Sequence, residues 1–148
     1  MSEPIVRIRL VKTISPEAAH AAVGAALRAG ADEGCAVVAA VVDAAGELVA
    51  FVRATGAPFH SSDIARDKAY TAASFKMPTA DIPGIVSGSD ALRDGITRRR
   101  NMVMFGGGLP IVVDGEIVGG IGVSGGSEAM DTAYANAGLA AIGAKRFD

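Results

Sequence analysis

The polar residues best suited to chemistry lie in two short segments of the chain, and the first is "FHSSDIARDKAY". It places a histidine, a carboxylate and a lysine close together, as His60, Asp63 and Lys68. A histidine titrates near neutral pH and can act as a general base, and a partly buried lysine can bind a carboxylate or transfer a proton. The structural alternative is that Asp63 stabilises the start of a helix and Lys68 forms a structural ion pair.

The second segment is "GGSEAMD", in which Glu128 and Asp131 lie one turn apart at the start of a predicted helix. These carboxylates either balance the helix dipole or form a pair that faces a pocket for acid–base work. Gly125 and Gly126 precede this helix, and backbone N–H groups at a helix N-terminus suit a carboxylate or propionate. We expect the N-termini of the two helices to converge on one site, with His60, Lys68 and Glu128 as its catalytic candidates.

Several further residues are candidates for the same site or for a cofactor. Phe59, Ser62, Asp63, Arg99 and Asp131 are expected to contact the ligand, although the cluster Arg98–Arg100 is more typical of a solvated helix face. His20 lies in an alanine-rich helix, where a solvated histidine is the default and a haem axial ligand is the functional alternative. The two histidines and one cysteine show no zinc-ligand spacing.

Residues 104–126 read "MFGGGLPIVVDGEIVGGIGVSGG", and this glycine content raises the question of a phosphate-binding loop. The segment lacks the lysine of a Walker loop, and its Gly-x-Gly-x-x-Gly match begins inside a predicted strand. We therefore interpret Gly119, Gly120 and Gly122 as positions where a helix, a partner or a flat ligand approaches the strand closely.

The elements predicted from the pattern alternate between strands and helices. Ser15 caps a helix that Gly34 ends, Ser61 or Ser62 caps a second, and Ser127 caps a third whose inner stripe is Met130, Ala133, Ala137 and Ala141. Two antiparallel hairpins are predicted, over residues 36–53 and around the Asp114–Gly115 turn over residues 110–123. Shorter strands are predicted at residues 6–13 and 101–105, and residues 77–101 form a connector with at most two helical turns.

Composition limits the remaining possibilities. The 148 residues are half apolar with a net charge of −2, which indicates one globular domain over residues 1–148 and argues against nucleic acid as a partner. No apolar run is long enough for a membrane span and no signal-peptide pattern is present, so a cytoplasmic location is expected. Helix stripes of alanine and glycine favour close packing between copies, in a homodimer or a multiple of dimers.

Three segments together resemble a known family: "GAPFHSSDIARDKAYTAASF", "GGGLPIVVDGEIVGGIGVSGG" and "EAMDTAYANAGLAAI". They look like the GlcG/HbpS family, also called the haem-degrading-domain family, which includes the C-terminal domain of PduO-type proteins. The resemblance implies a profilin-like α/β/α sandwich of three layers, with a five-stranded and mainly antiparallel sheet. It also implies homo-oligomers.

Two functional classes remain open. The resemblance favours a small-ligand-binding protein for haem or a related tetrapyrrole. The lack of a second strong haem ligand favours the alternative, a cofactor-independent catabolic enzyme of lyase or isomerase type. Its substrate would be a small organic acid or an aromatic-derived metabolite, bound in a pocket at a subunit interface.

Overall fold

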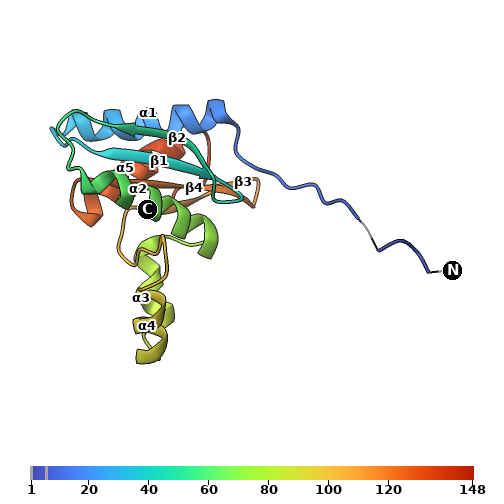
Figure 1. Ribbon diagram of the computed structural model, residues 1–148. Helices are drawn as coiled ribbons and strands as arrows, with labels where there is room; N and C mark the ends of the chain where they lie inside the picture. Colours follow the sequence, from blue (N-terminus) through green and yellow to red (C-terminus); the bar gives the residue numbers. More distant parts are fainter. Residues whose placement is uncertain (1, 6) are drawn as a thin grey trace.

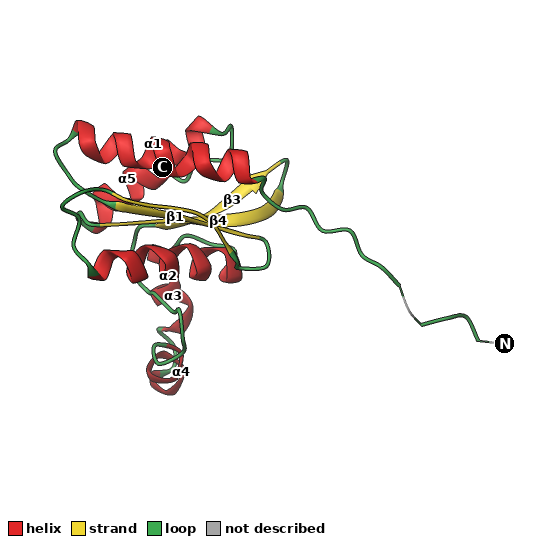
Figure 2. Cartoon of the chain, turned by 45° about the horizontal axis from the view of Figure 1, so that its top comes forward, coloured by secondary structure: helices red, strands yellow, loops and turns green. Residues whose placement is uncertain are grey.

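The computed structural model describes residues 2–5 and 7–148 and shows a sheet with helices on both faces (Figure 1). Four antiparallel strands lie in the order β2-β1-β4-β3. Helices α1 and α5 cover one face, and α2 covers the other (Figure 2). The predicted α/β/α sandwich is confirmed, but the sheet has four strands in place of the expected five.

The described residues form four strands, five α-helices and one 3-10 turn. The strands are β1 Val38–Asp43, β2 Leu48–Arg53, β3 Gly108–Val113 and β4 Glu116–Ser124. The helices are α1 Pro16–Asp32, α2 His60–Phe75, α3 Ile82–Val86, α4 Asp90–Ile96 and α5 Glu128–Ala141, with a 3-10 turn η1 at Thr79–Asp81. None of the helices in the described part of the chain combines the length and apolar character that a bilayer crossing requires.

Both hairpins form as predicted, whereas the two shorter strands do not. Asp114 and Gly115 both have positive φ, at 50° and 77°, as a type I′ turn requires. Val6 lies outside the described residues, and residues 7–13 are extended but form no strand, with Leu10 96% exposed. Residues 101–105 are held instead by Thr71 of α2, whose hydroxyl donates to Asn101 O at 2.7 Å and accepts from Val103 N at 3.1 Å.

The capping predictions hold for α1 and α5 and are wrong for α2. Ser15 accepts a hydrogen bond from Ala18 N, and Ser127 accepts one from Met130 N, both at 3.1 Å. Helix α2 begins at His60, so its N-cap is Phe59, two residues before Ser61, and it has no side-chain cap. Ser61 therefore lies inside the first turn, where it is buried and its Oγ accepts from Ser124 Oγ at 3.2 Å.

The buried face of α5 differs from the predicted alanine stripe. Ala133 and Ala141 are exposed, while Tyr134 and Leu139 are 2% and 0% exposed. Burying the larger apolar groups stabilises the fold more than burying alanine does, so the helix is turned by about one position. Tyr134 keeps its hydroxyl satisfied by donating to Glu33 Oε2 at 2.5 Å, and this bond, with burial, raises the pKa of the phenol.

The glycines of β4 explain how α2 packs on the sheet. A Cβ atom on Gly122 would lie 2.0 Å from Ala65 O, and one on Gly120 would lie 2.3 Å from Ala69 O. Both oxygens belong to the α2 backbone, so α2 sits on β4 at a distance that no side chain permits. The interpretation of these glycines as close-approach positions is confirmed, and the approaching element is α2.

The connector between α2 and β3 holds more helix than the sequence predicted. It contains η1, α3 and α4, and it projects away from the sandwich (Figure 1). Ile82 and Val86 are buried at 0% and 2% exposure. Ser89 caps α4 by accepting from Leu92 N at 3.1 Å. The buried side chains of Ile82 and Val86 and the capped helix α4 therefore make this segment more helical than its proline and glycine content predicted.

We predict that Gly122→Ala destabilises the fold by more than about 3 kcal/mol, because the new methyl group would overlap the α2 backbone. Urea unfolding followed by circular dichroism measures the change. Gly88→Ala is the matched control, since a Cβ there meets nothing within 4 Å, and it should change stability by less than about 0.5 kcal/mol. Equal effects of the two substitutions would show that α2 does not pack on β4 this closely.

Candidate ligand-binding site

A buried ion pair joins the two segments that carry the polar candidates. Lys68 Nζ lies 3.0 Å from Asp131 Oδ2 and donates to Val123 O at 2.8 Å. The two side chains are only 2% and 3% exposed. Lys68 thus ties α2 to strand β4 and to the first turn of α5, on the opposite face of the sheet.

The partners of this pair are themselves hydrogen-bonded. Asp131 Oδ1 accepts from Gly126 N at 2.8 Å, and Glu128 Oε1 accepts from Gly106 N at 2.7 Å. We call Lys68, Asp131, Glu128 and the backbone of residues 106 and 126 the Lys68 cluster. Burial lowers the pKa of Lys68 from its ordinary value of 10.5, and the carboxylates of Asp131 and Glu128 act in the opposite direction.

The glycine-rich bend before β3 closes over the ammonium group. Gly107 has φ of +119°, and a Cβ there would lie 2.5 Å from Lys68 Nζ. The Phe105 ring lies on another side, with its centroid 5.3 Å from Nζ. Lys68 is therefore enclosed by backbone, carboxylate and aromatic ring, and it borders no open cavity.

The ion-pair alternative for Lys68 describes what is observed, and its partner is Asp131. Helices α2 and α5 lie on opposite faces of the sheet (Figure 2). The first turn of α2 contacts the end of β4, where Ser124 Oγ donates to Ser61 Oγ at 3.2 Å. The Lys68 side chain, from the third turn of α2, reaches the first turn of α5.

The predicted site residues consequently fall into separate groups. Lys68, Glu128, Asp131 and Gly126 lie together in the Lys68 cluster, and Gly125 precedes it with φ of +141°. Phe59, His60, Ser62 and Asp63 lie at the start of α2, outside the cluster, with Phe59 85% exposed. Arg99 is exposed in the connector, and His20 is exposed on the outer face of α1.

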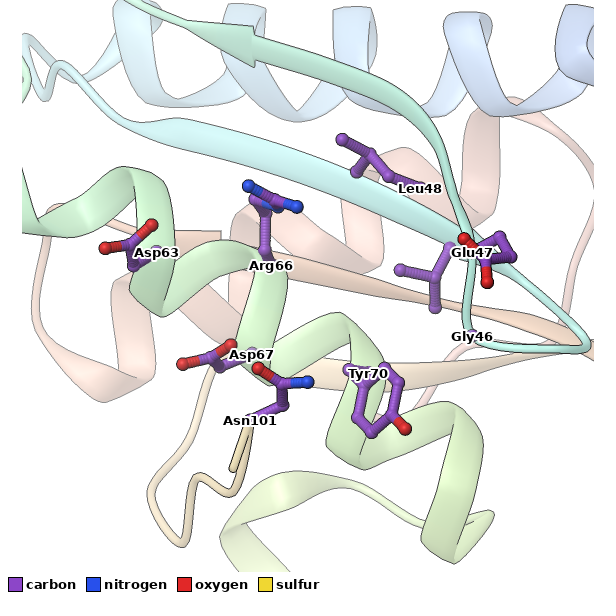
Figure 3. Close-up of a pocket in the computed structure, with 9 residues that line it drawn as sticks. Gly46, Glu47, Leu48, Asp63, Arg66, Asp67, Tyr70 and Asn101 are labelled. Carbon is purple, nitrogen blue, oxygen red and sulfur yellow. The ribbon is translucent and has the colours of Figure 1, made fainter. Parts of the chain in front are cut away.

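An open groove of about 490 Å³ runs between α2 and the turn that joins β1 to β2 (Figure 3). The carboxylates of Glu47, Asp63 and Asp67 line it together with the Arg66 guanidinium. Burial raises the pKa of Asp67, and the nearby Asp63 raises it further. The remaining lining residues are Val42, Gly46, Leu48, Tyr70 and Asn101.

Sequence reasoning identified only Asp63 among the residues of this groove. A signal was present, because Asp63 and Asp67 are four residues apart and so lie on one face of α2. Glu47 and Leu48 carried no such signal, since their approach to α2 depends on how the β1–β2 hairpin sits on the helix.

The outer face of α1 presents a second surface suited to a ligand. His20, Gly24 and Arg28 follow one another at intervals of four residues, so they form a stripe along the helix. A Cβ on Gly24 would meet only the Arg28 side chain, at 3.4 Å from Nη1. Beyond Arg28 lies a hollow of about 380 Å³ whose lining includes Leu27, Ala31, Cys35, Ala36 and Ala54.

A metal site built from protein side chains alone has no support in the described residues. There, no group of three or more histidine, cysteine, aspartate or glutamate side chains is placed to hold an ion.

Comparison with known proteins identifies the family. Residues 14–140 match the family described as "Haem degrading protein HbpS-like". The chain belongs to this HbpS-like family. A 15.0 kDa uncharacterised protein of Citrobacter freundii, from the dhaT–dhaS intergenic region, is 36% identical over 104 residues, 70% of this chain and 73% of that protein. The corrinoid adenosyltransferase PduO of Salmonella typhimurium is 36% identical over 107 residues, which are 72% of this chain and 32% of PduO.

Solved structures of HbpS-like proteins have the same fold. Klebsiella pneumoniae ORFY superposes with a TM-score of 0.87 at 30% identity, over 97% of this chain and all (100%) of that one. A double mutant of Streptomyces reticuli HbpS gives a TM-score of 0.82 at 32% identity, over 95% of this chain and 97% of that one. A complex of PduOC with haem gives 0.83 at 31% identity, over 92% of this chain and 99% of that one.

We predict that Lys68→Met destabilises the fold by about 3–5 kcal/mol, because it leaves Asp131 buried without its cation. The double variant Lys68→Met/Asp131→Asn should recover part of this loss, since asparagine can still accept the Gly126 N–H bond without carrying charge. Denaturant unfolding of the two single variants and the double variant gives the coupling free energy.

The exposed pair of Lys12 and Glu116, whose side chains are 69% and 51% exposed, is the control for this cycle. Lys12→Met should cost less than about 1 kcal/mol. If Lys68→Met costs no more than Lys12→Met, the Lys68 cluster does not hold the helices together.

Proposed function

We propose that this chain binds haem or a related tetrapyrrole on the outer face of α1, with His20 as the axial ligand. The observation that carries the proposal is the likeness to PduOC, whose structure is a complex with haem and which is 31% identical over 92% of this chain.

The His20–Gly24–Arg28 stripe has the chemistry that such a ligand requires. A neutral imidazole can coordinate haem iron from one side, and exposed His20 leaves its ring accessible. Gly24 presents no side chain, so a flat macrocycle can lie close to the helix backbone. The Arg28 guanidinium, whose Nη1 lies beside Gly24, is carried by a long flexible side chain and can pair with a propionate.

When bound, the haem would supply the redox and ligand-binding chemistry of its iron, and the protein would hold and orient it. The apolar hollow beyond Arg28 supports this arrangement, because ligand sites are mostly apolar with a few placed polar groups. The second candidate imidazole is His60, which starts α2 beside exposed Phe59. It lies beside the groove with three carboxylates, a poor environment for propionates.

The enzymatic alternative has less support from the geometry. It relied on Lys68 and Glu128 as acid–base groups, with His60. Lys68 is enclosed and ion-paired, and Glu128 is bonded to the backbone N–H of Gly106. Lys68 is only 2% exposed, so a substrate has little access to its ammonium group.

We predict that His20→Ala weakens haem binding at least about tenfold, or roughly 1.4 kcal/mol, and changes the Soret band by removing the axial imidazole. His60→Ala is the matched control and should change the affinity less than about twofold. Titration of each variant with haemin, followed by absorbance, measures both. Loss of binding in His60→Ala alone would place the site at the start of α2.

A second substitution separates ligand binding from stability. Gly24→Leu should raise the free energy of unfolding, since leucine is better than glycine inside a helix by up to about 1 kcal/mol. The same side chain should block a macrocycle and weaken haem binding at least about tenfold. Gly24→Ala is the control for size and should bind haem nearly as the natural chain does. Full affinity in Gly24→Leu would exclude this face.

A further inference from the structure

The N-terminal segment, residues 2–5 and 7–12, extends away from the domain (Figure 1), and we call it the arm. Its apolar side chains are open to solvent: Ile5, Ile8, Leu10 and Val11 are 95%, 90%, 96% and 74% exposed. Four large apolar groups on one extended segment form a surface that proteins normally cover with a partner.

The base of the arm is fixed to the domain. Thr13 Oγ1 accepts from Ala44 N at 3.0 Å, and Ile14 N donates to Val118 O at 3.0 Å. About ten extended residues reach roughly 35 Å beyond this anchor. The arm is therefore long enough to lie across a neighbouring domain of the same kind.

Strand β2 offers the surface on which such an arm fits. It is an edge strand of six residues, and within the described chain it pairs with β1 alone. Strand β3, at the other edge, is less suited because Pro110 removes a donor and Lys145 N already donates to Val112 O at 3.0 Å.

The two faces of β2 match the two faces of the arm. Val49, Ala50 and Val52 are half-buried and pack against the core between the sheet and α1. On the opposite face, Phe51 lies across from Ala40, and the groove with Glu47, Asp63 and Asp67 lies beside it. In an extended arm, Ile8 and Leu10 point to one side, and Arg9 and Val11 point to the other.

We propose that the arm of one chain pairs with the free edge of β2 in a second copy of the chain and adds a fifth strand to its sheet. Ile8 and Leu10 extend the core on the α1 side of that copy. Arg9 lies over the acidic groove, where three carboxylates face one guanidinium. Main-chain hydrogen bonds supply affinity, and the alternation of side chains fixes the register. This contact uses neither His20 nor Gly24, so it is independent of the haem site.

Cross-linking between two differently marked chains tests the proposal. In a Cys35→Ala background, one chain carries Val11→Cys and the other carries Phe51→Cys together with a mass tag. A short bifunctional maleimide should join them into a product with the summed mass of both chains. The control replaces Phe51→Cys with Ala140→Cys, on the exposed side of α5, and should give at least about tenfold less of the mixed product.

The cross-linked products distinguish an arm that binds a second copy from an arm that binds its own chain or something else. A chain that carries both cysteines and forms only an internal link, with no mixed product, would show that the arm folds back on its own β2 and would overturn the proposal. Absence of both products would show that the arm binds something else or nothing, and would also overturn it.

Charge reversal gives a second test with the same readout. Arg9→Glu and Asp67→Arg should each lower the yield of mixed product at least about tenfold, since like charges face one another across the contact. The two changes combined should restore it. Equal yields in all variants would show that the groove does not receive the arm.

Discussion

The packing of α2 directly onto the backbone of β4 is the constraint on which the rest of the structure depends. Gly120 and Gly122 leave room for the carbonyl groups of Ala69 and Ala65, at positions where any Cβ would overlap them. This close packing of α2 on β4 places Lys68 where its side chain reaches Asp131 on α5. A helix held further from the sheet would leave both charges buried without partners, at a cost of several kcal/mol.

The Lys68 cluster accounts for the two polar segments that first suggested a catalytic site. Its lysine, its two carboxylates and the glycine bend bond one another, with Lys68 and Asp131 buried and Glu128 at the exposed edge. Such a cluster fixes the relative positions of the two helices across the sheet, and each member depends on the others. The surfaces open to a ligand or a partner lie outside it, on α1, in the groove beside α2 and along the edge of β2.

The sequence predicted the parts of the fold that depend on local pattern. Asp114–Gly115 determined one hairpin, Ser15 and Ser127 capped their helices, and the glycines of β4 indicated close approach. Two short strands were predicted wrongly, at residues 6–13 and 101–105. Their sequences alternate or run apolar like strands, but the described residues of both segments join no ladder of the sheet. The partner of Lys68 was also missed. Asp131 is 63 residues away in the sequence, and only the tertiary fold brings it close.

The haem proposal and the arm proposal use different surfaces of one sandwich. The likeness to the PduOC–haem complex covers 92% of this chain. The haem contacts that we propose come from His20, Gly24 and Arg28, which all lie on α1. Helix α1 packs through alanine and valine on its inner face, so its outer face can carry ligand contacts without weakening the core. This separation lets the binding face be tested without disturbing the fold.

The location of the iron is the most direct test of the account. Ferric haem broadens the amide signals of nearby residues in a nitrogen-15 spectrum, and gallium protoporphyrin provides a diamagnetic control. The account predicts that haemin, and not the gallium complex, selectively broadens the signals of Ala19–Arg28 on α1. Broadening centred on residues 59–67 of α2, or no difference between the two porphyrins, would contradict it.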